Sequence, residues 1–280
     1  MTKEILHAAR QGLHRRLQEK LWSLQDGIAS NSDKDSPTSV SIGRTLAETL
    51  GVPSGKPRLR GSAAGAEFER QTVDFLRATF PALHHLRPGH WEIEPGSAIA
   101  KFEQYSHLDA LKEAAAGNAA LAAVLGSDYT IKPDIVIARA PEEDDRINRE
   151  APFVGNDTAG LTPLRRRNNS QHLLHASVSC KWTIRSDRTQ NSRAEALNLV
   201  RNRKGRAPHI AVVTAEPLPS RLVSIAIGTG DIDCTYHVAL HELREVVEAL
   251  ELDDARETLD LMVHGKRLRD VSDLPLDLAV

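Results

Sequence analysis

Two oppositely charged residues lie at the ends of two apolar segments of this chain. Asp134 lies within the β-rich run Tyr129–Arg139, and Lys181 lies near the end of the apolar run Leu173–Trp182, 47 residues later. If these runs form neighbouring strands, the carboxylate and the ammonium group can meet at one edge of a sheet. With a divalent metal ion, such a pair can support phosphodiester hydrolysis.

A second acid usually lies two residues before such a lysine, in the pattern D/E-x-K, but here that position is Ser179. Glu195, on a predicted helix fourteen residues after Lys181, is the natural substitute, because a helix packed on the sheet can direct a carboxylate into the same pocket. The backbone carbonyl of Cys180 could serve as a further oxygen ligand. A Pro-Asp turn and a strand-end lysine are also common structural features, so this pattern alone equally fits a protein without a site.

The segment from Ser179 to Arg206 is strongly basic. It holds eight Lys or Arg residues and two acidic residues, whereas the whole chain has a formal charge of −2. A local positive field within a nearly neutral chain indicates a bound polyanion, and a nucleic acid is the obvious candidate.

Within this segment, the quartet Arg185-Ser186-Asp187-Arg188 has the chemistry of base recognition. Arginine donates to guanine O6 and N7, and a carboxylate accepts from cytosine N4, so the quartet would read G and C. The alternative is a solvated loop with an internal Arg–Asp pair, which contributes little to stability.

The apolar spacing predicts a mixed α/β protein in which helices flank a strand core between about residues 129 and 237. We expect strands at 129–139, 173–182, 209–215 and 221–227, with one or two short strands in 90–105. We expect helices at 3–25, 41–51, 67–80, 106–125, 189–203 and 238–262. A Gly/Pro-rich basic linker spans 52–66, and the long polar stretch 140–171 is expected to be functional or disordered. The helix at 189–203 is expected to bury Ala194, Leu197 and Val200.

Composition limits the class of protein. The sequence pI is about 6.6, which excludes a diffusely basic protein, and two cysteines are too few for a disulfide framework. The first residues lack an apolar signal region, and no apolar run reaches the roughly 18 residues of a membrane span. We therefore expect a soluble, cytoplasmic protein.

The chain resembles type II restriction endonucleases of the NgoMIV kind, within the PD-(D/E)-x-K nuclease superfamily, over nearly its full length. The resemblance is densest in LGSDYTIKPD, LLHASVSCKWTIRSDR, LNLVRNRKGR, PHIAVVTAEP and SDLPLDLAV. It implies one restriction-endonuclease-like domain over 1–280, with a central mixed β-sheet flanked by α-helices. The catalytic core would span about 66–237, between an N-terminal DNA-reading segment (1–65) and C-terminal helices (238–280).

The resemblance also implies a function. It predicts a homotetramer, arranged as a dimer of dimers, that binds double-stranded DNA and uses Mg²⁺. This enzyme would cut within a CCGG core, with GCCGGC as the expected site, and leave 5′ phosphates on 5′ overhangs.

Particular residues acquire roles through the resemblance. Asp134 and Lys181 become the catalytic pair, and Glu195 replaces the missing acid. Glu69, which by itself reads as a solvated helix carboxylate, becomes a further active-site acid. The metal ligands would be Asp134, the Cys180 carbonyl and Glu195. The DNA contacts would be Arg185, Asp187 and Arg188 on the inner C/G pairs, Asp33 on the outer pair, and Ser62, which stands where the family has a glutamine at a minor-groove contact.

The residues alone also allow other functions. A structure-selective or repair nuclease could share the core and use the quartet on phosphates only, and a non-catalytic DNA-binding regulator could keep its acids for structure. A metal hydrolase based on His237 and His241 is disfavoured, because H-x-x-x-H-E does not place the acid between the ligands. Two surface helix histidines explain that motif better.

Overall fold

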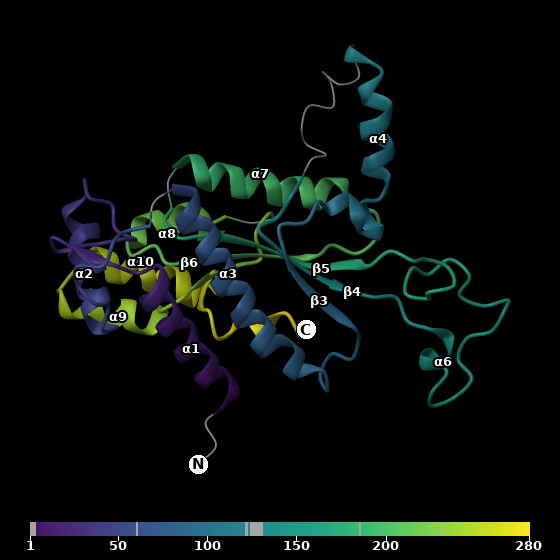
Figure 1. The fold of residues 1–280 in the computed structure, drawn as a ribbon, viewed down its shortest axis with the longest axis horizontal. Coiled ribbons are helices and arrows are strands. Elements are labelled where there is room, and N and C mark those ends of the chain that lie inside the picture. The colour runs from purple at the N-terminus through teal and green to yellow at the C-terminus, as the bar shows by residue number, and fades with distance from the viewer. Residues whose placement is uncertain (1–3, 60, 121–122, 124–130, 185, 229) are drawn as a thin grey trace.

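A six-stranded mixed β-sheet forms the centre of the molecule (Figure 1). The structure is a computed structural model that describes residues 4–59, 61–120, 123, 131–184, 186–228 and 230–280, without the side chains of 186–189. The sheet order follows the chain, and the first three strands are antiparallel whereas the last four run parallel. The strands are β3 Trp91–Pro95, β4 Ile135–Arg139, β5 Leu173–Lys181, β6 His209–Thr214, β7 Cys234–His237 and β8 Leu268–Asp270.

The middle strands are buried on both faces, and most of their residues are apolar or small. In β6 every residue from Ile210 to Thr214 is buried, and in β5 every residue from Leu174 to Cys180 is buried. These strands are the predicted ones, and the register joins Ile135 to Val178. The prediction that the strands bearing Asp134 and Lys181 are neighbours is confirmed.

Helices cover the sheet. Helix α3 packs against α1, β3 and β5, while α2, α9 and α10 gather at one end of the molecule (Figure 1). The predicted fold class, a mixed sheet flanked by helices, is therefore confirmed. The remaining bounds are α1 Ile5–Lys20, β1 Leu24–Gln25, β2 Ile28–Ala29, α2 Pro37–Thr49, α3 Gly61–Thr79, η1 Phe80–Leu83, η2 Ile99–Lys101, η3 Glu103–Tyr105, α4 His107–Ala116, α6 Asp144–Ile147, α7 Ser186–Asn202, α8 Pro219–Ala226, α9 Leu240–Ala249, α10 Asp253–His264 and α11 Leu274–Asp277.

One buried apolar cluster runs from Leu13 in α1 to Leu278 after α11. Arg10 reinforces this closure, because its guanidinium lies 2.6 Å from Glu242 of α9 and 2.8 Å from Asp270 of β8. The first and last parts of the described chain thus belong to the same core.

Several predicted elements are wrong. Residues 221–227 are not a strand, because they belong mostly to helix α8, which has Pro219 in its first turn. Strands β7 and β8 were not predicted. The predicted helix 238–262 is two helices, α9 and α10, separated at Leu250–Leu252, where Glu251 adopts a positive φ of 53°.

Three helices begin earlier than predicted. Helix α2 begins at Pro37, helix α3 begins at Gly61, within the predicted linker, and α7 begins at Ser186, within the quartet. Helix α7 buries Ala196 and Leu199, whereas the predicted contacts Ala194 and Leu197 are exposed. The predicted helix 106–125 is described as α4, and most of its last residues (121, 122, 124 and 125) lie outside the described residues.

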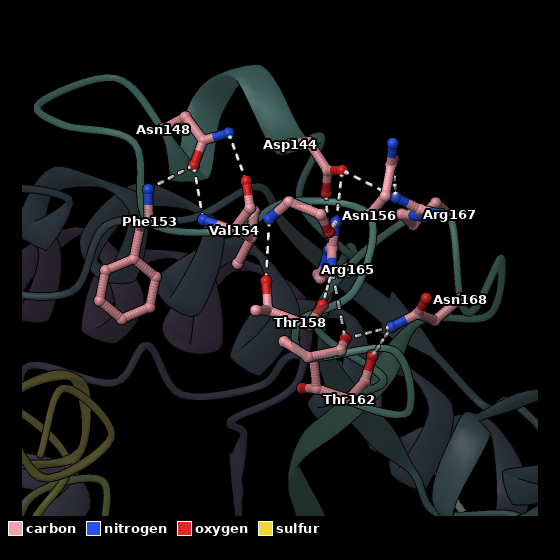
Figure 2. Close-up of polar contacts among 12 residues, drawn as sticks. Asp144, Asn148, Phe153, Val154, Asn156, Thr158, Thr162, Arg165, Arg167 and Asn168 are labelled. Atoms are coloured by element: carbon pink, nitrogen blue, oxygen red, sulfur yellow. Dashed lines mark hydrogen bonds and ion pairs between the residues drawn. The ribbon is translucent and has the colours of Figure 1, made fainter.

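The polar stretch between β4 and β5 is an ordered projection, defined here as residues 141–171, that extends away from the sheet (Figure 1). Arg165, which is 1% exposed, holds it together by donating to both Asp144 oxygens, at 2.8 and 2.6 Å, and to the Gly155 carbonyl at 3.1 Å (Figure 2). Asn148 accepts from the Phe153 and Val154 amides. Because Arg165 is buried in this network, its guanidinium serves the fold of the projection.

In the described part of the chain, none of the helices combines the length and the apolar character needed to cross a bilayer.

Candidate functional site

Asp134 is the centre of a polar cluster at the edge shared by β4 and β5. Its Oδ2 atom accepts three hydrogen bonds: from the Cys180 amide at 2.7 Å, from Lys181 Nζ at 2.8 Å and from Ser179 Oγ at 3.2 Å. The antiparallel register causes this convergence, because continuing the Ile135–Val178 pairing by one residue sets Asp134 opposite Ser179. The position where D/E-x-K would carry an acid therefore faces Asp134.

Glu195 approaches the same cluster from α7. Ser192, one turn earlier, lies with its Oγ atom 3.4 Å from Ser179 Oγ, which sets this face of α7 against the end of β5. Burial and, to a smaller extent, the Asp134 carboxylate raise the pKa of Glu195 to about 7, against the opposing influence of Lys181. The electrostatic influence of both residues indicates that Glu195 lies close to the Asp134–Lys181 pair.

Glu69 reaches the cluster from α3, on the residue after Phe68. The Phe68 ring packs edge-on against Trp182 at 5.4 Å, and Trp182 also contacts Trp22 at 5.3 Å, so α3 is fixed against the end of β5. Burial raises the pKa of Glu69, and Asp134 adds to this effect. Glu69 therefore lies near Asp134 and is partly buried. Its position in the helix alone would instead predict a solvated carboxylate.

The site carries an excess of negative charge. Glu69, Asp134 and Glu195 are three carboxylates around the ammonium group of Lys181. Burial first, and repulsion by the Asp134 charge second, raise the pKa values of Glu69 and Glu195. A divalent cation would relieve that repulsion, and carboxylate and carbonyl oxygens are the ligands that hard cations prefer. Within the described ranges, however, no three His, Cys, Asp or Glu side chains form a ready cation site.

Cys180 contributes its backbone and not its thiol. The side chain is buried, and burial together with the Asp134 charge raises the pKa of the thiol well above its usual range. A neutral thiol is a poor ligand for a hard cation, so only the carbonyl of Cys180 fits the predicted role.

The predicted base-reading quartet lies beside this cluster in sequence, and its last three residues, 186–188, open α7. Arg185 lies outside the described residues, as do the side chains of Asp187 and Arg188. Among the other basic residues in this segment, Arg193 stabilises the fold. Its guanidinium donates to Asp231 at 2.6 Å and to the carbonyls of Ser224 and Ile225.

A cleft of about 1160 Å³ lies next to the quartet. Asp33 lines it and forms an ion pair with Arg221, at the first turn of α8. Ser62 is exposed in the first turn of α3, between Gly61 and Gly65, which also line the cleft. The structure thus brings Asp33 to the opening segment of α3 and to Trp182–Ile184, which lead into the quartet.

Arg221 is a candidate functional residue that the sequence analysis missed. Residues 221–227 read as a strand because they are rich in β-branched residues. The signal that could have identified it is Pro219, since proline is favoured in the first turn of a helix, where an arginine at the exposed end can face a ligand. The two histidines of the disfavoured metal site also separate: His237 lies buried in β7, not on a surface helix, whereas His241 is exposed on α9.

Comparison with known proteins agrees with this geometry. The family model described as NgoMIV restriction enzyme matches residues 13–280. A curated relative, the type II restriction enzyme NgoMIV of Neisseria gonorrhoeae, is 51% identical over 259 residues, which cover 91% of each chain. The chain therefore belongs to the NgoMIV restriction enzyme family and is a type II restriction enzyme.

Proposed function

We propose that this enzyme hydrolyses double-stranded DNA at a palindrome with a CCGG core, GCCGGC, in a reaction that depends on Mg²⁺. The observation that carries the proposal is the contact of Lys181 with Asp134 at 2.8 Å, together with the charge of Asp134, which contributes to the raised pKa values of both Glu69 and Glu195. Family membership favours this function over a structure-selective nuclease or a non-catalytic regulator.

In this proposal, Lys181 orients the attacking water and neutralises charge on the scissile phosphate. The Asp134 carboxylate, the Cys180 carbonyl and the Glu195 carboxylate would hold Mg²⁺, and Glu69 would complete the acidic wall of the site. The chemistry supplied by the bound ion is polarisation of the phosphoryl oxygens and stabilisation of the leaving 3′ oxygen. The products are 5′ phosphates and 3′ hydroxyls, on 5′ overhangs.

Recognition is proposed for the side chains around the cleft. Arg185, Asp187 and Arg188 read the inner C/G pairs through the major groove. Asp33 reads the outer pair, and its ion-pair partner Arg221 supplies the fork of donors that guanine accepts. Ser62, exposed at the start of α3, takes the minor-groove position.

The proposed assembly is a homotetramer of two DNA-bound dimers. The projection offers apolar surface for such contacts, because Phe153 is 80% exposed and Leu161 is 98% exposed on a segment that Arg165 keeps ordered (Figure 2). Exposed large apolar side chains on an ordered segment are typical of contact surfaces. We further propose that residues 1–280 act as a single domain with its catalytic core at about 66–237, and that the enzyme works in the cytoplasm, where its two buried thiols suit a reducing environment.

The proposal is tested by digesting a plasmid of known sequence with Mg²⁺ and mapping every fragment end. Discrete fragments that begin at GCCGGC with 5′ overhangs are expected. Discrete ends at another sequence would refute the proposed site while keeping the enzyme class, and a smear would favour the structure-selective nuclease.

A further inference from the structure

Glu216 is a fully buried carboxylate that the mechanism above does not use. It follows β6 by two residues and has no exposed surface. Its two oxygens accept from two different elements: Oε2 accepts from the Ile184 amide at 2.8 Å, and Oε1 accepts from the Leu218 amide at 3.1 Å. Ile184 immediately precedes the quartet, and Leu218 immediately precedes α8.

Ile184 is held at both of its backbone polar groups. Its amide donates to Glu216, and its carbonyl accepts from Arg221 Nη1 at 3.3 Å. Arg221 in turn pairs with Asp33 across the cleft. The segment that leads into the quartet, the start of α8 and the loop that carries Asp33 are therefore linked through the Glu216 carboxylate and the Arg221 guanidinium.

The backbone next to Glu216 also contacts the loop that carries Asp33. Asn31, which is fully buried, donates to the Ala215 carbonyl at 2.7 Å and accepts from the Trp22 indole at 3.1 Å. The loop that begins at Asn31 and carries Asp33 is thus anchored one residue before Glu216. Asp33 is thus linked to the Glu216 segment in two ways: through the side chain of Arg221, and through the contact of Asn31 with the backbone of Ala215.

A carboxylate is an expensive group to bury, so its presence needs a reason. Burial raises the pKa of Glu216 to about 7, although the two amides and Arg221 favour the charged form. A glutamine of the same size presents only one oxygen, and its NH₂ group would oppose the second amide. Only a carboxylate of this length satisfies both amides at once.

We propose that Glu216 is a positioning residue that sets sequence specificity by fixing the quartet and Arg221 in one register along the DNA. The inference rests on the proposed reading roles of these residues. Without both hydrogen bonds, α7 and α8 can shift independently, so their arginines no longer contact neighbouring base pairs together. Discrimination then falls at inner and outer positions alike, although no base-contacting side chain has changed.

The test compares the wild-type enzyme with Glu216→Gln and Glu216→Asp. The shorter aspartate keeps the charge but cannot span both amides, and it provides a second variant if the glutamine variant folds poorly. Cleavage rates are measured on the site mapped for the wild-type enzyme and on sites that differ from it at one inner or one outer base pair. Thermal unfolding is measured in parallel.

The matched control is Asp270→Asn, another buried acid that accepts backbone and side-chain donors but lies among the C-terminal elements. Both Glu216 variants should lower the ratio of cognate to altered-site cleavage by about tenfold at inner and outer positions, since a poorly aligned bidentate base contact loses discrimination of that order. The control should lower the unfolding temperature without changing the ratio.

Uniformly slower cleavage with unchanged ratios in both Glu216 variants would overturn the inference and leave Glu216 a purely structural residue. A decrease in discrimination at only the inner or only the outer position would also overturn the inference, because Glu216 would then not position the quartet and Arg221 together. If the wild-type enzyme cuts a sequence other than GCCGGC, the same ratios are measured at that sequence, so failure of the proposed site remains separable from failure of this inference.

Discussion

Among the described residues, Lys181 is the cation whose charge opposes the raised pKa values of the two site glutamates, Glu69 and Glu195. Its Nζ atom lies 2.8 Å from Asp134. Loss of this group should therefore affect the reacting phosphate far more than the binding of DNA, which depends on the cleft.

Replacing Lys181 by Ala should abolish cleavage while retaining site-specific binding in Ca²⁺. The expected loss in rate is about a thousandfold or more, as for removal of other groups that stabilise transition-state charge. Cleavage in Mg²⁺ and a gel-shift titration in Ca²⁺ measure the two properties. Lys20→Ala, at the exposed end of α1, is the control and should cleave normally; turnover retained by Lys181→Ala would remove its catalytic role.

Glu195 should make the metal-free enzyme less stable as pH rises. Its pKa is about 7 in the folded chain and lies near 4.5 when unfolded, so the folded state binds more protons between these values. Stability attributable to this proton is present below about pH 4.5 and is lost as pH rises through 7. The loss should be on the order of 1–3 kcal/mol of unfolding free energy.

Denaturant unfolding at pH 5 and pH 8 without divalent ions checks this prediction. Glu195→Gln should lose less stability than the wild-type enzyme over that interval, because a neutral amide does not titrate. Glu113→Gln, on the exposed surface of α4, is the control. Identical pH dependence in wild type and Glu195→Gln would contradict the assignment.

At the scale of elements, the start of α8 presents Arg221 beside Asp33. Replacing Arg221 by Ala should reduce discrimination at one G·C position by about 1–3 kcal/mol, because a bidentate contact to guanine is lost. Arg221→Lys should restore little of it, since an ammonium group lacks the planar fork of donors.

Cleavage of oligonucleotides altered at single positions measures this effect. Arg256→Ala is the control, because Arg256 also forms an ion pair, with Asp253, on a helix away from the cleft. A uniform decrease over all oligonucleotides would indicate that Arg221 contacts phosphate and not a base.

The elements that carry Asp134 and Lys181 could be predicted because buried strands have an unmistakable composition. β4 reads Ile-Val-Ile-Ala before Arg139, and β5 contains mostly apolar and small residues, so their positions followed directly from the sequence. Residues 221–227 were predicted as a strand and form most of α8 instead. The run LVSIAI is compatible with either structure, and tertiary packing selects the helix. β7 and β8, of four and three residues, are too short for a periodic signal.

The site itself was predictable only in part. The spacing of Asp134, Ser179 and Lys181 fixed their proximity once their strands were taken as neighbours, and the register confirms it. Glu69 could not be found from spacing, because its approach depends on how α3 packs through Phe68 and Trp182. Such contacts between distant segments leave no local pattern in the sequence.

At the scale of the whole molecule, the projection presents two large, exposed apolar side chains, Phe153 and Leu161, away from the sheet. Phe153→Ser with Leu161→Ser should convert the proposed tetramer into smaller species, as measured by sedimentation velocity. Because both side chains are exposed, the free energy of unfolding of the variant should change by less than about 1 kcal/mol.

Leu261→Ser is the control for this experiment, since Leu261 is 62% exposed on α10 and lies outside the projection. It should sediment like the wild-type enzyme. An unchanged sedimentation coefficient in the Phe153 and Leu161 variant would place the contact between dimers elsewhere.

The ion pairs of Arg10 with Glu242 and Asp270 have a consequence for synthesis on the ribosome. All four proposed catalytic residues have been translated by residue 195, yet the partners of Arg10 emerge only after a further stretch of chain that contains β6, β7 and α9. Helix α1 cannot complete its packing before that point, so Trp22, which contacts Trp182 beside the site, lacks its final support. Completion of the packing beside the site therefore depends on residues that are translated after Glu195.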